Sequence, residues 1–173
     1  MDKELENLAA VVEDMILQLS YPGFDERSLK LGLPDAVSKY PPKTYGQALK
    51  HESTVVRLAA MRWFQERPGI AKTHLRPIVD CLEDVDGWVR REAISCLEKL
   101  DSLDNKIVEE IAELLVDRDV EVRKSAAKAL GKIGSNSDTI IGALQQASED
   151  ENHEVRWKAQ KALRKLGAYS SSS

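Results

Sequence analysis

The dipeptide Val-Arg recurs four times at a constant spacing of 33 residues, and the regularity extends to neighbouring positions. Each arginine is followed by an alanine three residues later and by a large apolar residue seven residues later. Self-similarity at a fixed period of about 20–50 residues is the signature of stacked supersecondary units that share one core. The sequence therefore predicts a repeat protein, with copies centred on Val56-Arg57, Val89-Arg90, Val122-Arg123 and Val155-Arg156.

Each 33-residue unit is predicted to contain two helices. In the third unit, apolar residues recur at i, i+4, i+7 and i+8 from Ile107, and a second stripe with helical spacing begins at Val122. Such stripes place apolar side chains on one helix face, where a neighbouring helix can bury them. Gly134 and Gly167 are placed to end second helices in the left-handed conformation, and Asp138 to cap the next first helix. These patterns predict an all-α fold, an α-solenoid of about four helix pairs.

The first 44 residues fit the period poorly and are interpreted as a degenerate helical N-terminal cap. They contain an amphipathic helix over residues 2–19 and a short helix that Pro34 opens and Pro41-Pro42 ends. A serine-rich tail at the C-terminus is predicted to be disordered. Nothing polar is found to cap the last unit, which is consistent with a domain cut from a longer array. The predicted segments are 1–44 for the cap, 45–70, 71–103, 104–136 and 137–167 for the repeats, and 168–173 for the tail.

Composition limits the classes of function. The formal net charge of −4 argues against binding of nucleic acid over the whole surface, because chains that do so are usually basic. No apolar run approaches the roughly 18–20 residues of a membrane span, and the N-terminus lacks the pattern of a secretory signal. We therefore expect a cytoplasmic or nuclear protein without a membrane span. Cys81 and Cys96 occupy apolar columns of the repeat, so each is predicted to be a buried thiol and not half of a disulfide.

No arrangement of residues in the sequence points to catalysis. The chain lacks a glycine-rich phosphate loop, an HExxH or CxxC motif and a nucleophilic serine elbow. Its three histidines, His51, His74 and His153, lie in separate units and give no metal-ligand spacing. We therefore predict a non-enzymatic protein with no catalytic residues, no metal and no cofactor.

Three stretches of the chain, residues 83–93, 116–134 and 149–159, resemble HEAT repeats. The signatures of ankyrin and tetratricopeptide repeats, which have similar lengths, are missing. The resemblance covers about residues 44–167, and it implies a structural ladder of charged residues that runs from repeat to repeat between the paired helices. Matched to this sequence, the ladder consists of Asp84, Asp117, Asp150, Arg57, Arg90, Arg123 and Arg156, and His51 replaces the first aspartate.

Two kinds of HEAT-repeat enzyme bear on the prediction. The short, regular form of these repeats is similar to units found in cyanobacterial bilin lyases, so a subunit of a bilin-lyase-like enzyme is an alternative function. Deoxyhypusine hydroxylase, as its family implies, holds two irons with His-Glu pairs at the start of the second helices. Here the pairs His51-Glu52 and His153-Glu154 fall in the predicted interhelical turns, before Val-Arg, and they are interpreted as turn residues.

The resemblance also directs attention to the second helices, which line the concave face of HEAT arrays. In the third and fourth units these helices are basic, whereas the first helix of the third unit is acidic. Trp157 falls in a column of mostly non-core residues and is expected to be exposed beside the cations. The candidate partner-binding residues, which we call the basic stripe, are Arg91, Lys124, Lys128, Lys132, Trp157, Lys158, Lys161 and Lys165.

We interpret the basic stripe as a surface for an acidic segment of another protein, so that the chain would act as an interaction module or scaffold. Two alternatives stay open: binding of a nucleic-acid backbone, and a solvated face whose lysines only complement the helix dipoles. The net charge and the lack of interleaved aromatic residues make nucleic acid the less favoured partner. Trp63 shares a column with small core residues and is predicted to be buried, while Trp88 fits either environment.

Overall fold

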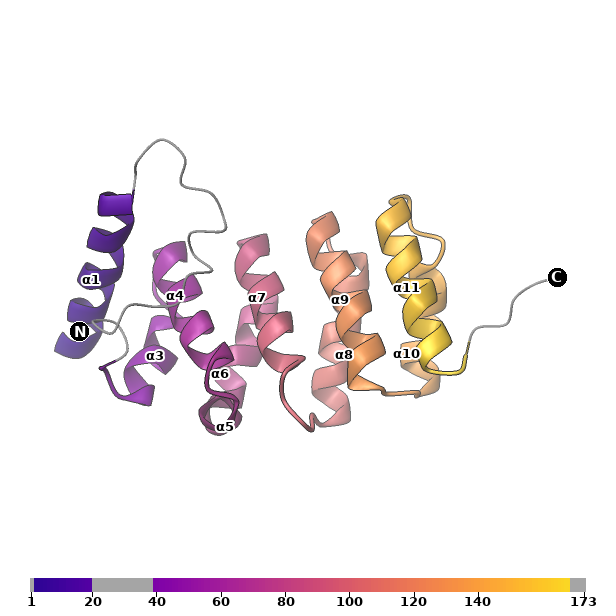
Figure 1. Cartoon of the computed structure of the whole chain (residues 1–173), viewed down its shortest axis with the longest axis horizontal. Coiled ribbons are helices and arrows are strands. Elements are labelled where there is room, and N and C mark those ends of the chain that lie inside the picture. The colour runs from indigo at the N-terminus through magenta and orange to yellow at the C-terminus, as the bar shows by residue number, and fades with distance from the viewer. Residues whose placement is uncertain (1, 20–38, 169–173) are drawn as a thin grey trace. The chain divides into compact units, whose positions relative to one another are not determined.

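The structure is a computed structural model that describes residues 2–19 and 39–168, and every regular element in these residues is a helix (Figure 1). The prediction of an all-α fold is confirmed. The chain divides into two compact units, Met1–Cys81 and Leu82–Ser173. The second predicted repeat, residues 71–103, is divided between them. The predicted disordered tail lies outside the described residues from position 169 onward.

Unit 1 is organised around its first helix, which packs on the next two helices that the structure describes. The buried side chains of Leu8 and Val12 lie on one face of this helix, as the amphipathic pattern predicts. The helices of unit 1 are α1 (Lys3–Leu19), α3 (Pro42–Ala48), α4 (Thr54–Gln65), α5 (Pro68–Ala71) and α6 (Leu75–Asp80), and the 3-10 turn η2 (Lys72–His74) precedes α6.

The helix α3 begins at the second proline of Pro41-Pro42, because Pro42 is its first residue. Proline suits this position, since the first N–H groups of a helix have no partner within the helix and the ring fixes a helical φ. The predicted boundary between residues 44 and 45 therefore falls inside α3. The helix predicted from Pro34 lies largely outside the described residues.

Aromatic side chains fill the core of unit 1. The rings of Tyr45 in α3 and Trp63 in α4 stack with centroids 3.9 Å apart, and Trp63 meets Phe64 edge to face at 5.2 Å. Trp63 is 3% exposed, which confirms its predicted packing role. Ring pairs with these geometries are favourable beyond the apolar area that they bury.

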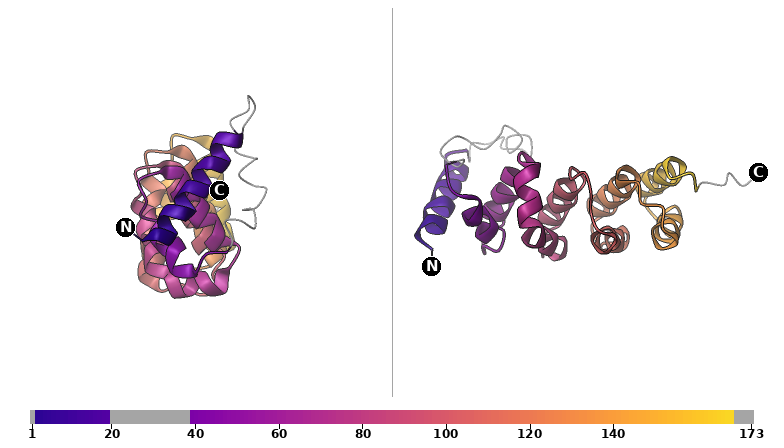
Figure 2. Two further views of the ribbon diagram at one scale, coloured as in Figure 1. Left: turned by 90° about the vertical axis from the view of Figure 1, so that its left-hand side faces the viewer. Right: turned by 90° about the horizontal axis from the view of Figure 1, so that it is seen from below.

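Unit 2 consists of two layers of helices. The second helices of successive repeats lie side by side in one layer, and first helices form the other layer, as the right-hand view of Figure 2 shows for the last two repeats. The first layer contains α7 (Gly87–Leu97), α9 (Val120–Ile133) and α11 (His153–Lys165), and we call it the α7–α9–α11 layer. The other contains α8 (Asn105–Glu113) and α10 (Asp138–Ala147).

The ends of the helices in unit 2 follow the predictions with one exception. Gly134 and Gly167 have φ values of 83° and 71°, which confirms their predicted left-handed conformation. Ser137, and not Asp138, caps α10, because its hydroxyl accepts from the N–H of Ile140 and its backbone is extended. Asp138 is the first helical residue, where a negative charge favours the helix dipole.

Polar side chains occupy positions in the last repeat that are apolar in the repeat before it. Ala112 and Ala127 are buried, whereas the residues 33 positions later, Gln145 and Gln160, are exposed and half-buried respectively. Two amide side chains of the last repeat thus stand at positions where the preceding repeat buries methyl groups. Membership of a longer array stays a prediction.

Candidate functional site

The interhelical turns of unit 2 share one hydrogen-bond pattern. In the turn before α7, Nη1 of Arg90 donates to the carbonyl oxygen of Asp84 at 2.7 Å. The Asp84 carboxylate accepts from the backbone N–H of Asp86 at 2.9 Å. The turns before α9 and α11 repeat both bonds at equivalent positions. Each Arg of the Val-Arg dipeptide therefore closes its own turn.

His51 keeps this pattern in the turn before α4. Its Nδ1 accepts from the backbone N–H of Ser53 at 3.1 Å, as the aspartate oxygen does in the other turns. Its carbonyl oxygen accepts from Nη1 of Arg57 at 2.9 Å. An imidazole nitrogen can replace the carboxylate here because the turn needs one acceptor at this point.

Two buried arginine–aspartate ion pairs join consecutive repeats in unit 2. Nε and Nη2 of Arg90 donate to the two carboxylate oxygens of Asp117 at 2.8 and 2.7 Å. Arg123 lies against Asp150 at similar distances, with Nε 2.9 Å from one carboxylate oxygen and Nη2 donating to the other at 3.2 Å, although Nε makes no hydrogen bond. The side chains of Arg90 and Asp117 are 6% and 8% exposed. Bidentate pairs fix the relative geometry of the groups that they join, so these pairs hold the α7–α9–α11 layer in register.

Two cations of the basic stripe are already occupied by groups of the same chain. Arg91 lies over the ring of Trp88, 3.9 Å from its centre. Lys124 contacts the carboxylate of Glu121 at 2.7 Å and that of Glu154, and hydrogen bonds to these two carboxylates raise the pKa of Lys124. Lys124 therefore has little capacity left for a partner, and Arg91 is held against Trp88.

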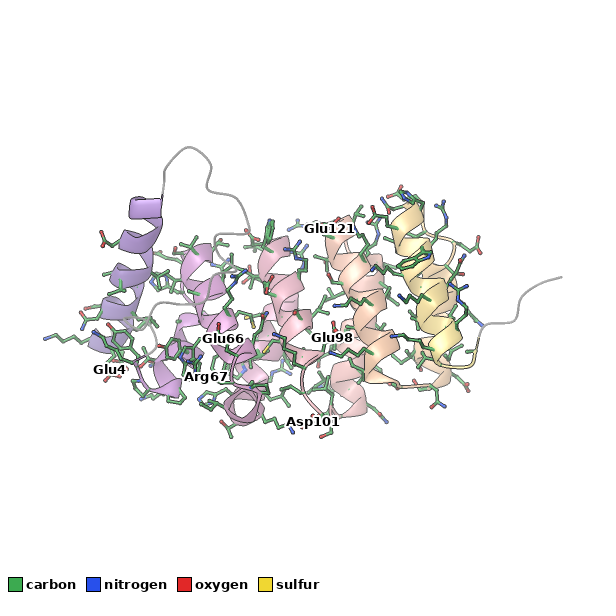
Figure 3. All side chains as sticks on the ribbon, in the orientation of Figure 1. Glu4, Glu66, Arg67, Glu98, Asp101 and Glu121 are labelled. Atoms are coloured by element: carbon green, nitrogen blue, oxygen red, sulfur yellow. The ribbon has the colours of Figure 1, made fainter. Side chains whose placement is uncertain are left out.

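Lys128 and Lys132 share a carboxylate that the sequence analysis did not include. Oε1 of Glu98, the residue that follows α7, is 3.3 Å from Nζ of each lysine, and the Glu98 side chain is 9% exposed. Glu98 lies between α7 and α9 (Figure 3). Glu98 lies outside the basic helices α9 and α11, so the sequences of these helices do not reveal it. The basic stripe is therefore interrupted in its middle by one negative charge.

The cations of α11 differ from those of α9. Nζ of Lys158 and Nζ of Lys161 lie 4.9 and 4.8 Å from the ring centre of Trp157, which is 49% exposed. Among the described residues, no carboxylate lies within ion-pair distance of Lys158, Lys161 or Lys165. This end of the stripe combines ammonium groups without a direct ion-pair partner among the described residues with an exposed aromatic surface.

Two grooves of about 140 Å³ each run between neighbouring helices of this layer. The α7–α9 groove has both acidic and basic side chains in its lining, which consists of Arg91, Glu92, Ile94, Ser95, Glu98, Ser125 and Lys128. The α9–α11 groove carries only positive charge and is lined by Ala127, Lys128, Gly131, Lys158, Lys161, Ala162 and Lys165. A larger hollow of about 660 Å³, between the loops that follow α7 and α9, again carries both charges. The α9–α11 groove is therefore the candidate site for an anionic group.

The sequence profile of HEAT repeats matches residues 75–141 and 108–172, which together make up more than half of the chain. The chain belongs to the HEAT repeat family. No curated protein is similar enough in sequence to match it.

Solved structures share the fold of this HEAT repeat protein at low sequence identity. A designed armadillo repeat protein in complex with the peptide (KR)4 is 18% identical, with a TM-score of 0.58 over 81% of this chain and 79% of its own. An engineered protein is 21% identical, with a TM-score of 0.59 over 84% and 69%. The archaeal HEAT-like repeat protein of Thermococcus onnurineus NA1 is 20% identical, with a TM-score of 0.50 over 100% and 79%. These likenesses confirm the predicted class, an α-solenoid of HEAT-like helix pairs.

The histidines and cysteines of the described residues do not form a group that could bind a metal ion. His153 is the first residue of α11, so His153-Glu154 opens a helix and does not lie in the interhelical turn as predicted. Cys81 and Cys96 are buried free thiols, as predicted. In the part of the chain that the structure describes, no three His, Cys, Asp or Glu side chains are grouped to hold a metal ion, and no helix is long and apolar enough to cross a membrane.

Gly131 sets the floor of the α9–α11 groove, and its substitution tests the packing of these two HEAT repeats. A Cβ atom at this position would lie 2.8 Å from Cα and Cβ of Ala162, so one helix would have to move. Gly131→Ala is expected to lower the free energy of unfolding by about 1–3 kcal/mol, as overpacking does. Gly142→Ala is the matched control, because Gly142 lies within α10 with no atom within 4 Å and alanine should there stabilise by about 0.4–1 kcal/mol. Urea denaturation measures both, and stabilisation by Gly131→Ala would contradict the close approach.

Proposed function

We propose that this HEAT repeat protein is a non-enzymatic protein-interaction module whose α7–α9–α11 layer binds an acidic segment of a partner protein. The proposal rests mainly on the α9–α11 groove, whose lining contains no carboxylate and four lysines, of which only Lys128 has a carboxylate partner among the described residues. Uncompensated positive charge lowers the energy of an approaching acidic segment and raises its rate of association.

Trp157 supplies the apolar part of the proposed surface. Its indole is half exposed and lies close to the ammonium groups of Lys158 and Lys161. Tryptophan is among the residues that contribute most to binding when a partner covers them. A partner segment that combines acidic side chains with an apolar residue would match both features.

Several observations favour a protein partner over the alternatives. Lys124, Lys128 and Lys132 have acidic partners in the chain itself, so the stripe does not offer the long row of free cations that a nucleic-acid backbone needs. The designed armadillo repeat protein of similar fold is in complex with a basic peptide, and the charge of the groove here favours the opposite sign. The bilin-lyase-like alternative rests on the shared repeat alone. A cytoplasmic or nuclear setting is proposed from the sequence only.

The test is affinity capture from cell lysate by the intact chain and by a charge-reversed variant. Lys161→Glu/Lys165→Glu replaces two exposed cations of the groove, and we expect it to lose the captured proteins. Capture by the intact chain should weaken as salt rises, because exposed charges are screened over about 10 Å at 0.1 M ionic strength. Quantitative mass spectrometry of the captured proteins measures both effects.

Lys99→Glu/Lys106→Glu is the matched control. It makes the same change in net charge at two exposed lysines outside the α9–α11 groove, and it is expected to capture the same proteins as the intact chain. Equal losses with the two double variants would contradict a site in this groove. Loss of capture after nuclease treatment of the lysate would instead support binding to a nucleic-acid backbone.

A further inference from the structure

The α7–α9 groove contains a carboxylate clamp made by the chain itself. Oε1 of Glu98 lies 3.3 Å from Nζ of both Lys128 and Lys132. The carboxylate side chain is 9% exposed, while the two lysines are 60% and 55% exposed. Two ammonium groups one helical turn apart on α9 thus hold one carboxylate in the groove beside α7 (Figure 3).

The residues 33 positions after those of the clamp lie in the next groove, and one of the three is different. Lys161 and Lys165 on α11 occupy the positions of Lys128 and Lys132 on α9, but Gly131 occupies the position of Glu98. All three residues line the α9–α11 groove. The two lysines of the clamp are therefore repeated without the carboxylate that they would hold.

The packing of α9 against α11 explains why the chain does not supply this carboxylate. A side chain at position 131 would begin with a Cβ 2.8 Å from Ala162, so the close approach of the helices excludes glutamate there. The groove stays open above this small floor, and Lys158 adds a third ammonium from α11. In the part of the chain that the structure describes, no residue supplies a carboxylate to Lys161 and Lys165, so a partner can supply one.

From this comparison we infer that the α9–α11 groove is a receptor for a glutamate or aspartate side chain of the partner, which takes the place that Glu98 takes in the α7–α9 groove. The inference rests on the proposed function and specifies the chemistry of its ligand. It favours a carboxylate over a phosphate because the clamp of the preceding repeat already holds a carboxylate with the same pair of lysines.

The experiment titrates the full chain with short blocked peptides and follows backbone amides by NMR. The peptides are identical except for one central residue, which is glutamate, glutamine or phosphoserine. We expect the glutamate peptide to shift the amides of Gly131, Lys161 and Lys165 and to bind at least tenfold more tightly than the glutamine peptide. Lys161→Gln/Lys165→Gln should abolish these shifts, while Lys99→Gln/Lys106→Gln should preserve them.

Glu98→Ala provides a test by gain of binding. Removing the carboxylate of Glu98 frees Lys128 and Lys132. The protein should then have a second binding site for the glutamate peptide, and the peptide should also shift the amides around those two lysines. Circular dichroism checks that each variant keeps the helical fold. The inference is overturned if the glutamate and glutamine peptides bind equally tightly, if only the phosphoserine peptide binds, or if Glu98→Ala creates no second binding site. Capture of acidic proteins that Lys161→Glu/Lys165→Glu abolishes would still support the proposed function in those cases.

Discussion

Replacing Arg90 with methionine is expected to lower the free energy of unfolding by about 3–5 kcal/mol. Methionine keeps a long side chain but removes both donors from Asp117, whose side chain is only 8% exposed. It also removes the bond of 2.7 Å to the carbonyl oxygen of Asp84. The buried Asp117 carboxylate then keeps the hydrogen bond from the backbone N–H of Asp119 but has no cationic partner to offset its lost hydration, and this accounts for the large expected effect. Urea denaturation followed by far-ultraviolet circular dichroism measures the loss.

Two further variants test whether the loss of stability comes from the buried pair of Arg90 and Asp117. Arg90→Met/Asp117→Leu is expected to recover most of the stability, because two apolar side chains then fill the site and no charge is left stranded. Arg118→Met is the matched single control, because Arg118 is exposed and donates to the carbonyl oxygen of Val85. Its cost is expected to be below about 1 kcal/mol. Equal losses with Arg90→Met and Arg118→Met would contradict a stabilising role of the buried pair.

Lowering the pH should reduce the difference in the free energy of unfolding between the wild-type protein and Arg90→Met. Burial by itself raises the pKa of Asp117, but hydrogen bonds from Arg90 and from the backbone N–H of Asp119 outweigh it and hold the pKa below its usual value. A lowered pKa in the folded state contributes stability that is present above the unfolded pKa of about 4 and is lost as pH falls through the folded pKa. The variant lacks this contribution. Its loss of unfolding free energy relative to the wild-type protein should therefore be larger at about pH 7 than at about pH 3.

The repeated architecture could be predicted because the same columns are buried in every repeat. Val89, Val122 and Val155 are each 0% exposed, and the alanines three residues after the following arginines are buried as well. Burial of one column in successive units needs only the period and the helical spacing of the apolar residues, and both can be counted in the sequence. The large exposed fraction of Trp157 follows from the same columns, since its equivalents include Arg91 and Lys124.

The pairing of charges at the candidate site could not be predicted from those columns. Lys128 and Lys132 have no acidic residue within four positions on α9, yet Glu98 reaches them from the end of the preceding second helix. Such a contact depends on the separation and rotation of neighbouring helices, which the apolar pattern leaves unspecified. The signal that could have revealed it is the comparison of equivalent positions, where Glu98 in one repeat becomes Gly131 in the next.

The second large effect is expected in unit 1, where Phe64→Ala should lower the free energy of unfolding by about 3–5 kcal/mol. Phe64 is 0% exposed, and its ring meets Trp63 edge to face and lies 5.3 Å from the ring of His74. Truncation to alanine removes this aromatic pair and leaves a cavity that a close-packed core fills only in part. Urea denaturation followed by tryptophan fluorescence measures the loss, because the ring of Trp63 lies against the substituted position.

Phe64→Leu is the matched control for this truncation. Leu97, Leu130 and Leu163 occupy the equivalent position in the other repeats, and all three are buried. Leucine keeps most of the apolar volume, so its cost is expected to be about 1.5 kcal/mol or less. If alanine cost no more than leucine, the neighbouring side chains would have to collapse into the space, and Phe64 would not be the packed counterpart of those leucines. The 33-residue register would then need revision in the residues before position 75, which the HEAT repeat profile does not reach.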